Sequence, residues 1–167
     1  MEIRLYSFND NQELAYLKML ECQSIIDENS VSNGGPLRQE DLLLQLLDWQ
    51  YLITANVDEK PIGLSLVRKS HEDKHNTGQT DYYYISLIAV LPKLQRNGIG
   101  SELLNTTLSL PLSLPIVASC RKDNEVSYHF LSNRMINYNS TRRYHRFVYN
   151  KEYSDLLEKR NSIWKNV

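Results

Sequence analysis

The chain has 167 residues, and its 19 Lys and Arg nearly balance its 20 Asp and Glu, for a formal net charge of −1. This length suits one domain with a core of its own, and the balanced charge disfavours nucleic acid or an anionic membrane as a partner. No stretch approaches the roughly 18 apolar residues of a membrane span, and the N-terminus lacks a signal peptide's apolar region. Two cysteines, Cys22 and Cys120, do not make a disulfide framework and favour a reducing, cytoplasmic location.

The first elements are expected to be one strand and two helices. Alternation of Ile3 and Leu5 with polar neighbours predicts a short strand. Asp10 and Glu13 have the spacing of a capping box and predict a helix start. The apolar residues expected on one face of this helix are Leu14, Leu17, Leu20 and Ile25. After the turn residues 32–36, a second helix is expected to bury Leu43, Leu46, Leu47 and Trp49.

The later elements alternate between strand and helix. Residues 51–55 and 62–67 are expected to form a hairpin around the turn 58–61. After a polar loop at 69–81, the expected elements are strand 82–90, helix 98–108, strand 116–120, a helix capped by Asp123 or Asn124 and running to about 134, strands near 138 and 146–149, and a terminal helix. The pattern predicts a mixed α/β (α+β) class around one sheet. We expect a single domain over 1–167, with 151–167 as a helical extension.

Residues 82–104 read as a buried strand, a turn rich in backbone amides, and the start of a helix. Such a turn directs unpaired N–H groups and the positive end of a helix toward one point. Proteins hold phosphates in this way, and glycine lets the backbone approach the ligand closely. This stretch therefore predicts a site for a phosphate-bearing cofactor. The alternative is a tight turn whose glycines serve packing alone.

Gln95, Gly98 and Gly100 match the acetyl-CoA motif Arg/Gln-x-x-Gly-x-Gly/Ala, with Val90-x-Pro92 upstream and Asn124 opening the next helix. On these residues the chain resembles the GNAT superfamily, the Gcn5-related N-acetyltransferases, over roughly residues 1–150. The resemblance implies a single mixed, mostly antiparallel sheet flanked by helices. It also implies acetyl-CoA as co-substrate. No metal is expected, because a metal site at His71 and His75 would need a third ligand and a rigid frame, and the sequence shows neither. The implied cofactor-binding residues are Ile88, Val90, Gln95, Arg96, Asn97, Gly98, Ile99, Gly100, Ser101 and Asn124.

The catalytic residues of the family are only partly matched. Many members place a tyrosine seven residues after the asparagine, as acid for the departing thiolate, but here that position is Leu131. Tyr128 shares its helix face and is the substitute candidate. The family's frequent glutamate base falls near Tyr84, which can hold a water. Packing against the sheet is the alternative role for either tyrosine.

The function expected from the resemblance is transfer of acetyl from acetyl-CoA to the primary amine of a small-molecule acceptor, by direct attack in a ternary complex. Two alternatives stay open: a module that binds acyl-CoA without transfer, and an acetyltransferase for a macromolecule such as a protein N-terminus or an aminoacyl-tRNA. His71 and His75 lie in the polar loop before the central strand. They are expected either to be exposed loop residues or to contact the acceptor. The terminal helix, with Ile163 and Trp164, is expected either to pack on the domain or to form a homodimer contact.

Overall fold

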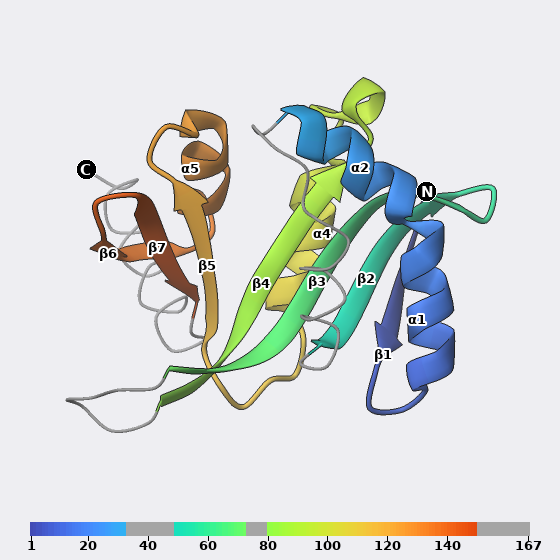
Figure 1. Ribbon diagram of the computed structural model, residues 1–167, viewed down its shortest axis with the longest axis horizontal. Helices are drawn as coiled ribbons and strands as arrows, with labels where there is room; N and C mark the ends of the chain where they lie inside the picture. The colour runs from blue at the N-terminus through green and yellow to red at the C-terminus, as the bar shows by residue number, and fades with distance from the viewer. Residues whose placement is uncertain (33–48, 73–79, 150–167) are drawn as a thin grey trace, which may run out of the picture. The chain divides into compact units, whose positions relative to one another are not determined.

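The structure, a computed structural model, describes residues 1–32, 49–72 and 80–149. The chain forms two compact units, Met1–Pro111 and Leu112–Val167. Both units contain strands and helices (Figure 1). The mixed α/β class predicted from the pattern of elements is therefore confirmed.

The first unit is built on an antiparallel sheet with the order β1-β2-β3-β4. Its strands are β1 (Glu2–Ser7), β2 (Trp49–Val57), β3 (Lys60–Glu72) and β4 (Thr80–Val90). Figure 1 shows helices on both faces of this sheet. The predicted hairpin is confirmed, because β2 and β3 are joined by Asp58 and Glu59, both with positive φ (49° and 65°). Such a two-residue turn matches the twist of the paired strands.

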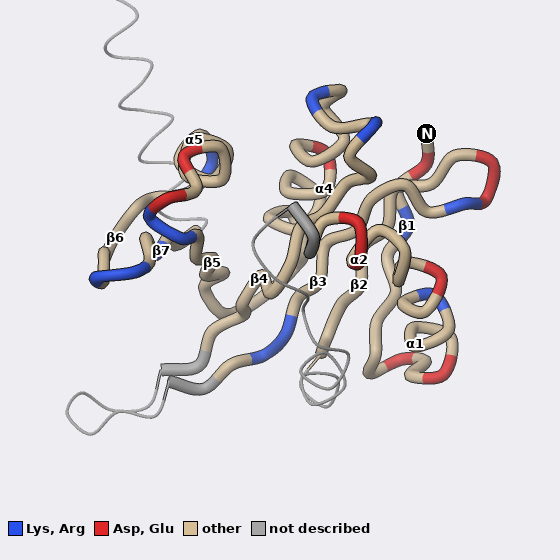
Figure 2. The backbone as a smooth tube through the Cα atoms, turned by 45° about the horizontal axis from the view of Figure 1, so that its top comes forward, with Lys and Arg blue, Asp and Glu red and all other residues tan. Residues whose placement is uncertain are grey.

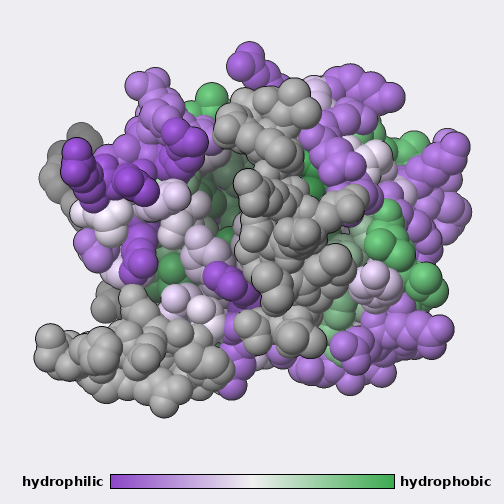
Figure 3. All heavy atoms as spheres, viewed as in Figure 1, coloured by the Kyte–Doolittle hydropathy of each residue, from purple (hydrophilic) through white to green (hydrophobic). Residues whose placement is uncertain are grey.

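Helices α1 (Gln12–Glu21) and α2 (Gln23–Ser32) cover one face of the sheet. Two details differ from the sequence prediction. The capping residue of α1 is Asn11, whose Oδ1 accepts the Leu14 N–H at 2.9 Å. The helix buries Ala15 and Met19, while Leu14, Leu17 and Leu20 are 41 to 50% exposed. Figure 3 shows apolar side chains at the surface beside α1. Both stripes have helical spacing, so the period alone could not select the buried one.

The other face of the sheet is covered by α4 (Ile99–Leu108), which follows the short 3₁₀ helix η2 (Pro92–Leu94). The predicted helix at 98–108 is thus confirmed, and Ile99 and Leu103 are buried as expected. A Cβ atom on Gly63 would lie 3.1 Å from both the Ala89 carbonyl oxygen and Leu103 Cδ1. Gly63 therefore lets α4 pack closely on β3 and β4.

In its described part, residues 112–149, the second unit has three strands in the order β5-β7-β6 and one helix. The strands are β5 (Ile116–Arg121), β6 (Ile136–Ser140) and β7 (Tyr144–Tyr149). Helix α5 (Glu125–Ser132) begins after Asn124, whose Oδ1 accepts the Ser127 N–H at 2.9 Å. This confirms Asn124 as the capping residue, because its side chain satisfies an N–H left open by the first turn.

Some predictions meet different structure or lie beyond the described residues. Trp49 is the first residue of β2, not part of a helix. Strand β3 extends to Glu72 and β4 begins at Thr80, so both ends of the predicted loop at 69–81 are strand. Residues 73–79, with His75, lie outside the described residues. The rest of the second helix and the terminal helix also lie outside them. In the described part of the chain, no helix is long and apolar enough to cross a membrane.

Candidate functional site

The loop between β4 and α4 passes twice through the left-handed backbone region. Arg96 has φ 65° and Gly98 has φ 82°. A Cβ atom on Gly98 would meet no other atom within 4 Å. Gly98 is therefore required by its backbone conformation and not by packing, which weighs against the reading in which this glycine serves packing alone. A non-glycine residue such as Arg96 in this region stores strain, which is common at ligand sites.

The N-terminus of α4 has no side-chain cap. Its N-cap residue is Gly98, and the first intrahelical bond into this turn is donated by the Glu102 N–H to the Gly98 carbonyl at 3.0 Å. The N–H groups of Ile99, Gly100 and Ser101 therefore have no acceptor inside the helix. Together with the helix dipole they favour an anion at this end.

A network of side-chain amides fixes the loop to the sheet and to α2. Gln95 Nε2 donates to the Val90 carbonyl and to Asn29 Oδ1, each at 3.2 Å. Asn29 Nδ2 donates to the same Val90 carbonyl at 3.1 Å and to the Ile25 carbonyl at 2.8 Å. Asn29 is only 8% exposed. The side chain of Gln95, predicted to bind cofactor, is thus engaged in positioning the loop.

Other residues of the motif complete the loop. Asn97 Nδ2 donates to the carbonyls of Leu94 (3.2 Å) and Gln95 (3.3 Å), which closes the turn on itself. Lys93 and Arg96 are exposed, and Figure 2 shows basic residues in the segment before α4. The loop therefore adds positive charge to an end of α4 that already favours anions.

Strand β4 directs the backbone groups of alternate residues away from β3. The Leu91 N–H donates to the Ile62 carbonyl of β3 at 2.9 Å. Because residues alternate in an antiparallel ladder, Val90 and Ile88 direct their N–H and C=O groups away from β3. The Val90 carbonyl is taken by the amides of Asn29 and Gln95. The Val90 N–H and the backbone groups of Ile88 face the same edge.

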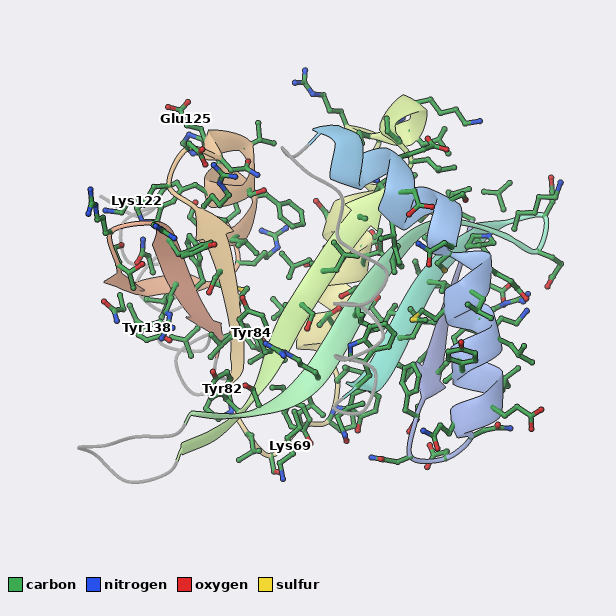
Figure 4. The ribbon with its side chains drawn as sticks, in the orientation of Figure 1. Lys69, Tyr82, Tyr84, Lys122, Glu125 and Tyr138 are labelled. Atoms are coloured by element: carbon green, nitrogen blue, oxygen red, sulfur yellow. The ribbon has the colours of Figure 1, made fainter. Side chains whose placement is uncertain are left out.

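The tyrosines of β4 divide between the two faces as predicted. The Tyr82 and Tyr84 rings contact edge to face at 6.5 Å between centroids; both are labelled in Figure 4. Tyr83 packs on the α4 side beside Tyr51, at 6.3 Å. Burial raises the pKa of the Tyr51 hydroxyl, and the neighbouring Tyr83 raises it further. Tyr84 also lies under a cation, with the Arg68 guanidinium carbon 5.1 Å from its ring centroid.

The remaining two predicted site residues, Asn124 and Tyr128, belong to the second unit. The Asn124 side-chain oxygen Oδ1 serves as the helix cap. The Tyr128 ring makes edge-to-face contacts with His145 (4.8 Å) and Phe147 (5.6 Å) of β7. Leu131, at the family's usual tyrosine position, is 6% exposed. The contacts of Tyr128 agree with the packing role that the sequence left open, and they do not test its role as an acid.

Sequence reasoning missed two residues, Asn29 and Arg68. Asn29 continues the buried stripe of Cys22, Ile25 and Ile26 at helical spacing. A polar residue in such a stripe was a readable signal, since buried polar groups are nearly always hydrogen-bonded to a specific partner. Arg68 directly follows the apolar part of β3 and offered a similar, weaker signal.

The strand, the amide-rich loop and the uncapped helix have the arrangement that proteins commonly use to hold phosphates. Residues 21–135 match the family described as the Acetyltransferase (GNAT) family. The chain therefore belongs to the GNAT acetyltransferases, and the GNAT-like fold predicted from its sequence is confirmed.

Solved structures share this fold. A GNAT family acetyltransferase from Bacillus cereus is 18% identical, with a TM-score of 0.57 over 90% of this chain and 96% of that one. An aminoglycoside acetyltransferase from an uncultured soil metagenomic sample, in complex with sisomicin, is 17% identical, with a TM-score of 0.57 over 84% and 90%. No curated protein matches the sequence.

Proposed function

We propose that this protein transfers acetyl from acetyl-CoA to the primary amine of a small-molecule acceptor. The observation that carries the proposal is the loop before α4, with left-handed backbone at Arg96 and Gly98 and three open N–H groups on the first turn of the helix. Membership of an acetyltransferase family supports the same ligand.

The residues of the first unit fit the parts of acetyl-CoA. The amides from Arg96 to Ser101 would hold the pyrophosphate, with charge added by Arg96 and Lys93. The Val90 N–H and the backbone of Ile88 would bond the pantetheine arm. Asn124, a residue of the second unit, stays the candidate from the sequence for positioning the end of that arm. When bound, this co-substrate supplies an acetyl group already activated as a thioester.

The chain's own residues would manage two protons. The acceptor amine, with an ordinary pKa of about 10.4, must lose a proton before it can attack. Tyr84 would hold the water that receives it, and Tyr128 would donate to the departing sulfur. Through that water, the ammonium gives its first proton to solvent before it attacks. As the new C–N bond forms and the C–S bond breaks, the nitrogen loses a second proton, which balances the proton that Tyr128 gives to sulfur.

One rival function keeps support from a specific residue. Leu131 is buried and cannot donate a proton, and Tyr128 is packed against the sheet of its unit. These features favour a module that binds acyl-CoA without transferring the group. An acetyltransferase for a protein N-terminus or an aminoacyl-tRNA is the other rival, and the balanced charge of the chain weighs against tRNA.

The test is release of free thiol from acetyl-CoA across a panel of primary amines. We expect turnover with at least one amine, and a large loss of kcat for Tyr84→Phe and Tyr128→Phe. Tyr16→Phe is the matched control, because Tyr16 is an exposed residue of α1. Binding of acetyl-CoA without turnover would favour the module, and unchanged kcat would remove the mutated tyrosine from the mechanism.

We further propose a cytoplasmic location and a chain that can form a homodimer. Cys22 and Cys120 are both free and buried, which supports a reducing compartment. The elution volume of the full chain on a sizing column would give the oligomeric state.

A further inference from the structure

A row of three side chains crosses the sheet on the face covered by α1 and α2. In the ladders, Arg68 of β3 lies opposite Trp49 of β2 on one side and opposite Tyr84 of β4 on the other. Residues opposed in an antiparallel ladder share a face of the sheet. Trp49 belongs to the core cluster under α1 and α2, which identifies that face.

Two nitrogen atoms in this row are buried hydrogen-bond donors with no acceptor. They are Trp49 Nε1 and Arg68 Nε, as judged over the described residues. Trp49 is only 2% exposed. An indole N–H and a guanidinium can only donate, so neither group can satisfy the other. Such donors are rare in folded proteins, and each points to an acceptor at that place.

The acceptor that suits this pair carries negative charge. Arg68 is always protonated and partly buried, and no ion pair of the described residues includes it. Arg68 lies over the Tyr84 ring, with its guanidinium carbon 5.1 Å from the ring centroid. A cation–π contact offsets only part of the cost of removing a charge from water, whereas a carboxylate supplies both charge and two acceptor oxygens.

The two donors belong to residues that lie directly opposite one another in the ladder. Directly opposed residues of an antiparallel ladder have Cα atoms about 4.5–5.5 Å apart. The anion would lie beside Tyr84, the residue proposed to hold the water that deprotonates the amine. It would also lie on the side of the sheet that α1 and α2 cover.

We infer that Arg68 and Trp49 bind a carboxylate of the acceptor, so that the acceptor is an amine bearing a carboxylate, of the amino-acid class. This inference rests on the proposed acetyl transfer, since it assigns the row to the acceptor of that reaction.

The test uses N-acetylglycine, N-acetyl-L-leucine and N-acetyl-L-phenylalanine as probes, each beside the matching amide that lacks the carboxylate. Affinities are measured by calorimetry with and without CoA. We expect at least one acid to bind about tenfold or more tighter than its amide, the effect of a charge-assisted hydrogen bond. Arg68→Gln should abolish this ratio, Trp49→Phe should reduce it, and Arg68→Lys should restore part of it.

Lys69→Gln is the matched control. It removes the same charge one residue away, but Lys69 pairs with Tyr83 in the ladder, and Tyr83 packs on the opposite face. Figure 4 labels Lys69 on β3. The control variant should keep the wild-type ratio of acid to amide affinity.

Equal affinity for acid and amide, or no binding of any acid, would overturn the inference. So would an unchanged ratio in Arg68→Gln, or tighter binding of inorganic phosphate than of any acid. Failure of CoA to bind would count against the proposed acetyl transfer instead, because the acids are also titrated without CoA. The two failures are therefore distinguishable.

Discussion

Asn29 accepts a hydrogen bond of 3.2 Å from Gln95, across a separation of 66 residues in the sequence. Helix α2 thereby holds the loop that precedes α4, and both side chains also donate to the Val90 carbonyl. The shape of the proposed cofactor loop thus depends on a residue outside the motif.

Replacing Asn29 by Asp tests this dependence. The change preserves shape but removes the donor to Val90 and Ile25 and places a carboxylate against two carbonyl oxygens. We expect the free energy of unfolding to fall by about 1–3 kcal/mol and the Kd for acetyl-CoA to rise about tenfold or more. Urea unfolding and calorimetry measure the two effects.

Asn139→Asp serves as the control for Asn29→Asp, since Asn139 is an exposed residue of β6. It should leave both quantities near their wild-type values. An Asn29→Asp variant that loses stability but keeps its acetyl-CoA affinity would show that α2 does not position the loop.

Gly63→Ala is expected to disturb the packing of α4. The new methyl group would lie 3.1 Å from the Ala89 carbonyl oxygen and from Leu103 Cδ1, and overpacking of this kind costs about 1–3 kcal/mol of unfolding free energy. Adding Leu103→Ala should relieve the side-chain part of the clash. The double variant should therefore lose less stability in urea than the sum of the single variants, and strict additivity would contradict the contact.

Ser65 and Thr107 form a buried pair with an asymmetric outcome on mutation. Their hydroxyl oxygens are 2.8 Å apart, and Thr107 donates to the Leu103 carbonyl at 2.8 Å. Ser65 must therefore donate to Thr107. Thr107→Val leaves the Ser65 hydroxyl without its acceptor and should cost about 1–3 kcal/mol, more than Ser65→Ala. The double variant should be more stable than Thr107→Val alone, by thermal or urea unfolding; the reverse order would be inconsistent with this pairing.

Cys22 should resist thiol reagents in the folded protein. Burial, more than the nearby Glu21 charge, raises the pKa of its thiol to about 12, so little thiolate forms at pH 8. Because the folded pKa is above the unfolded one, stability from the protonated thiol is complete below about pH 8.5 and is lost as pH rises toward 12. Reaction of Cys22 with a disulfide reagent, followed by mass spectrometry, should be slow at pH 8 and fast in urea. Fast reaction without urea would contradict burial.

The sequence was sufficient for features set by local chemistry. The hairpin around Asp58, the cap at Asn124 and the helix after Gly98 follow from turn, capping and glycine preferences that act within a few residues. The resemblance at Gln95, Gly98 and Gly100 led to the family that the comparison confirms.

Features set by tertiary contacts were missed. The leucines of α1 and its Ala15–Met19 stripe both have helical spacing, and only the position of the sheet decides which is buried. Asn29 and Arg68 gain their roles from Val90, Gln95, Trp49 and Tyr84, which are brought to them by the fold. The catalytic roles of Tyr84 and Tyr128 stay predictions, because they depend on an acceptor.

The central claim is that the loop before α4 binds acetyl-CoA, and equilibrium unfolding in urea with and without acetyl-CoA tests it most directly. At a concentration a hundredfold above the Kd, acetyl-CoA should raise the free energy of unfolding by about 2.7 kcal/mol, and Gly98→Ala should require more acetyl-CoA for the same shift. An unfolding free energy that does not change up to millimolar acetyl-CoA would contradict the account.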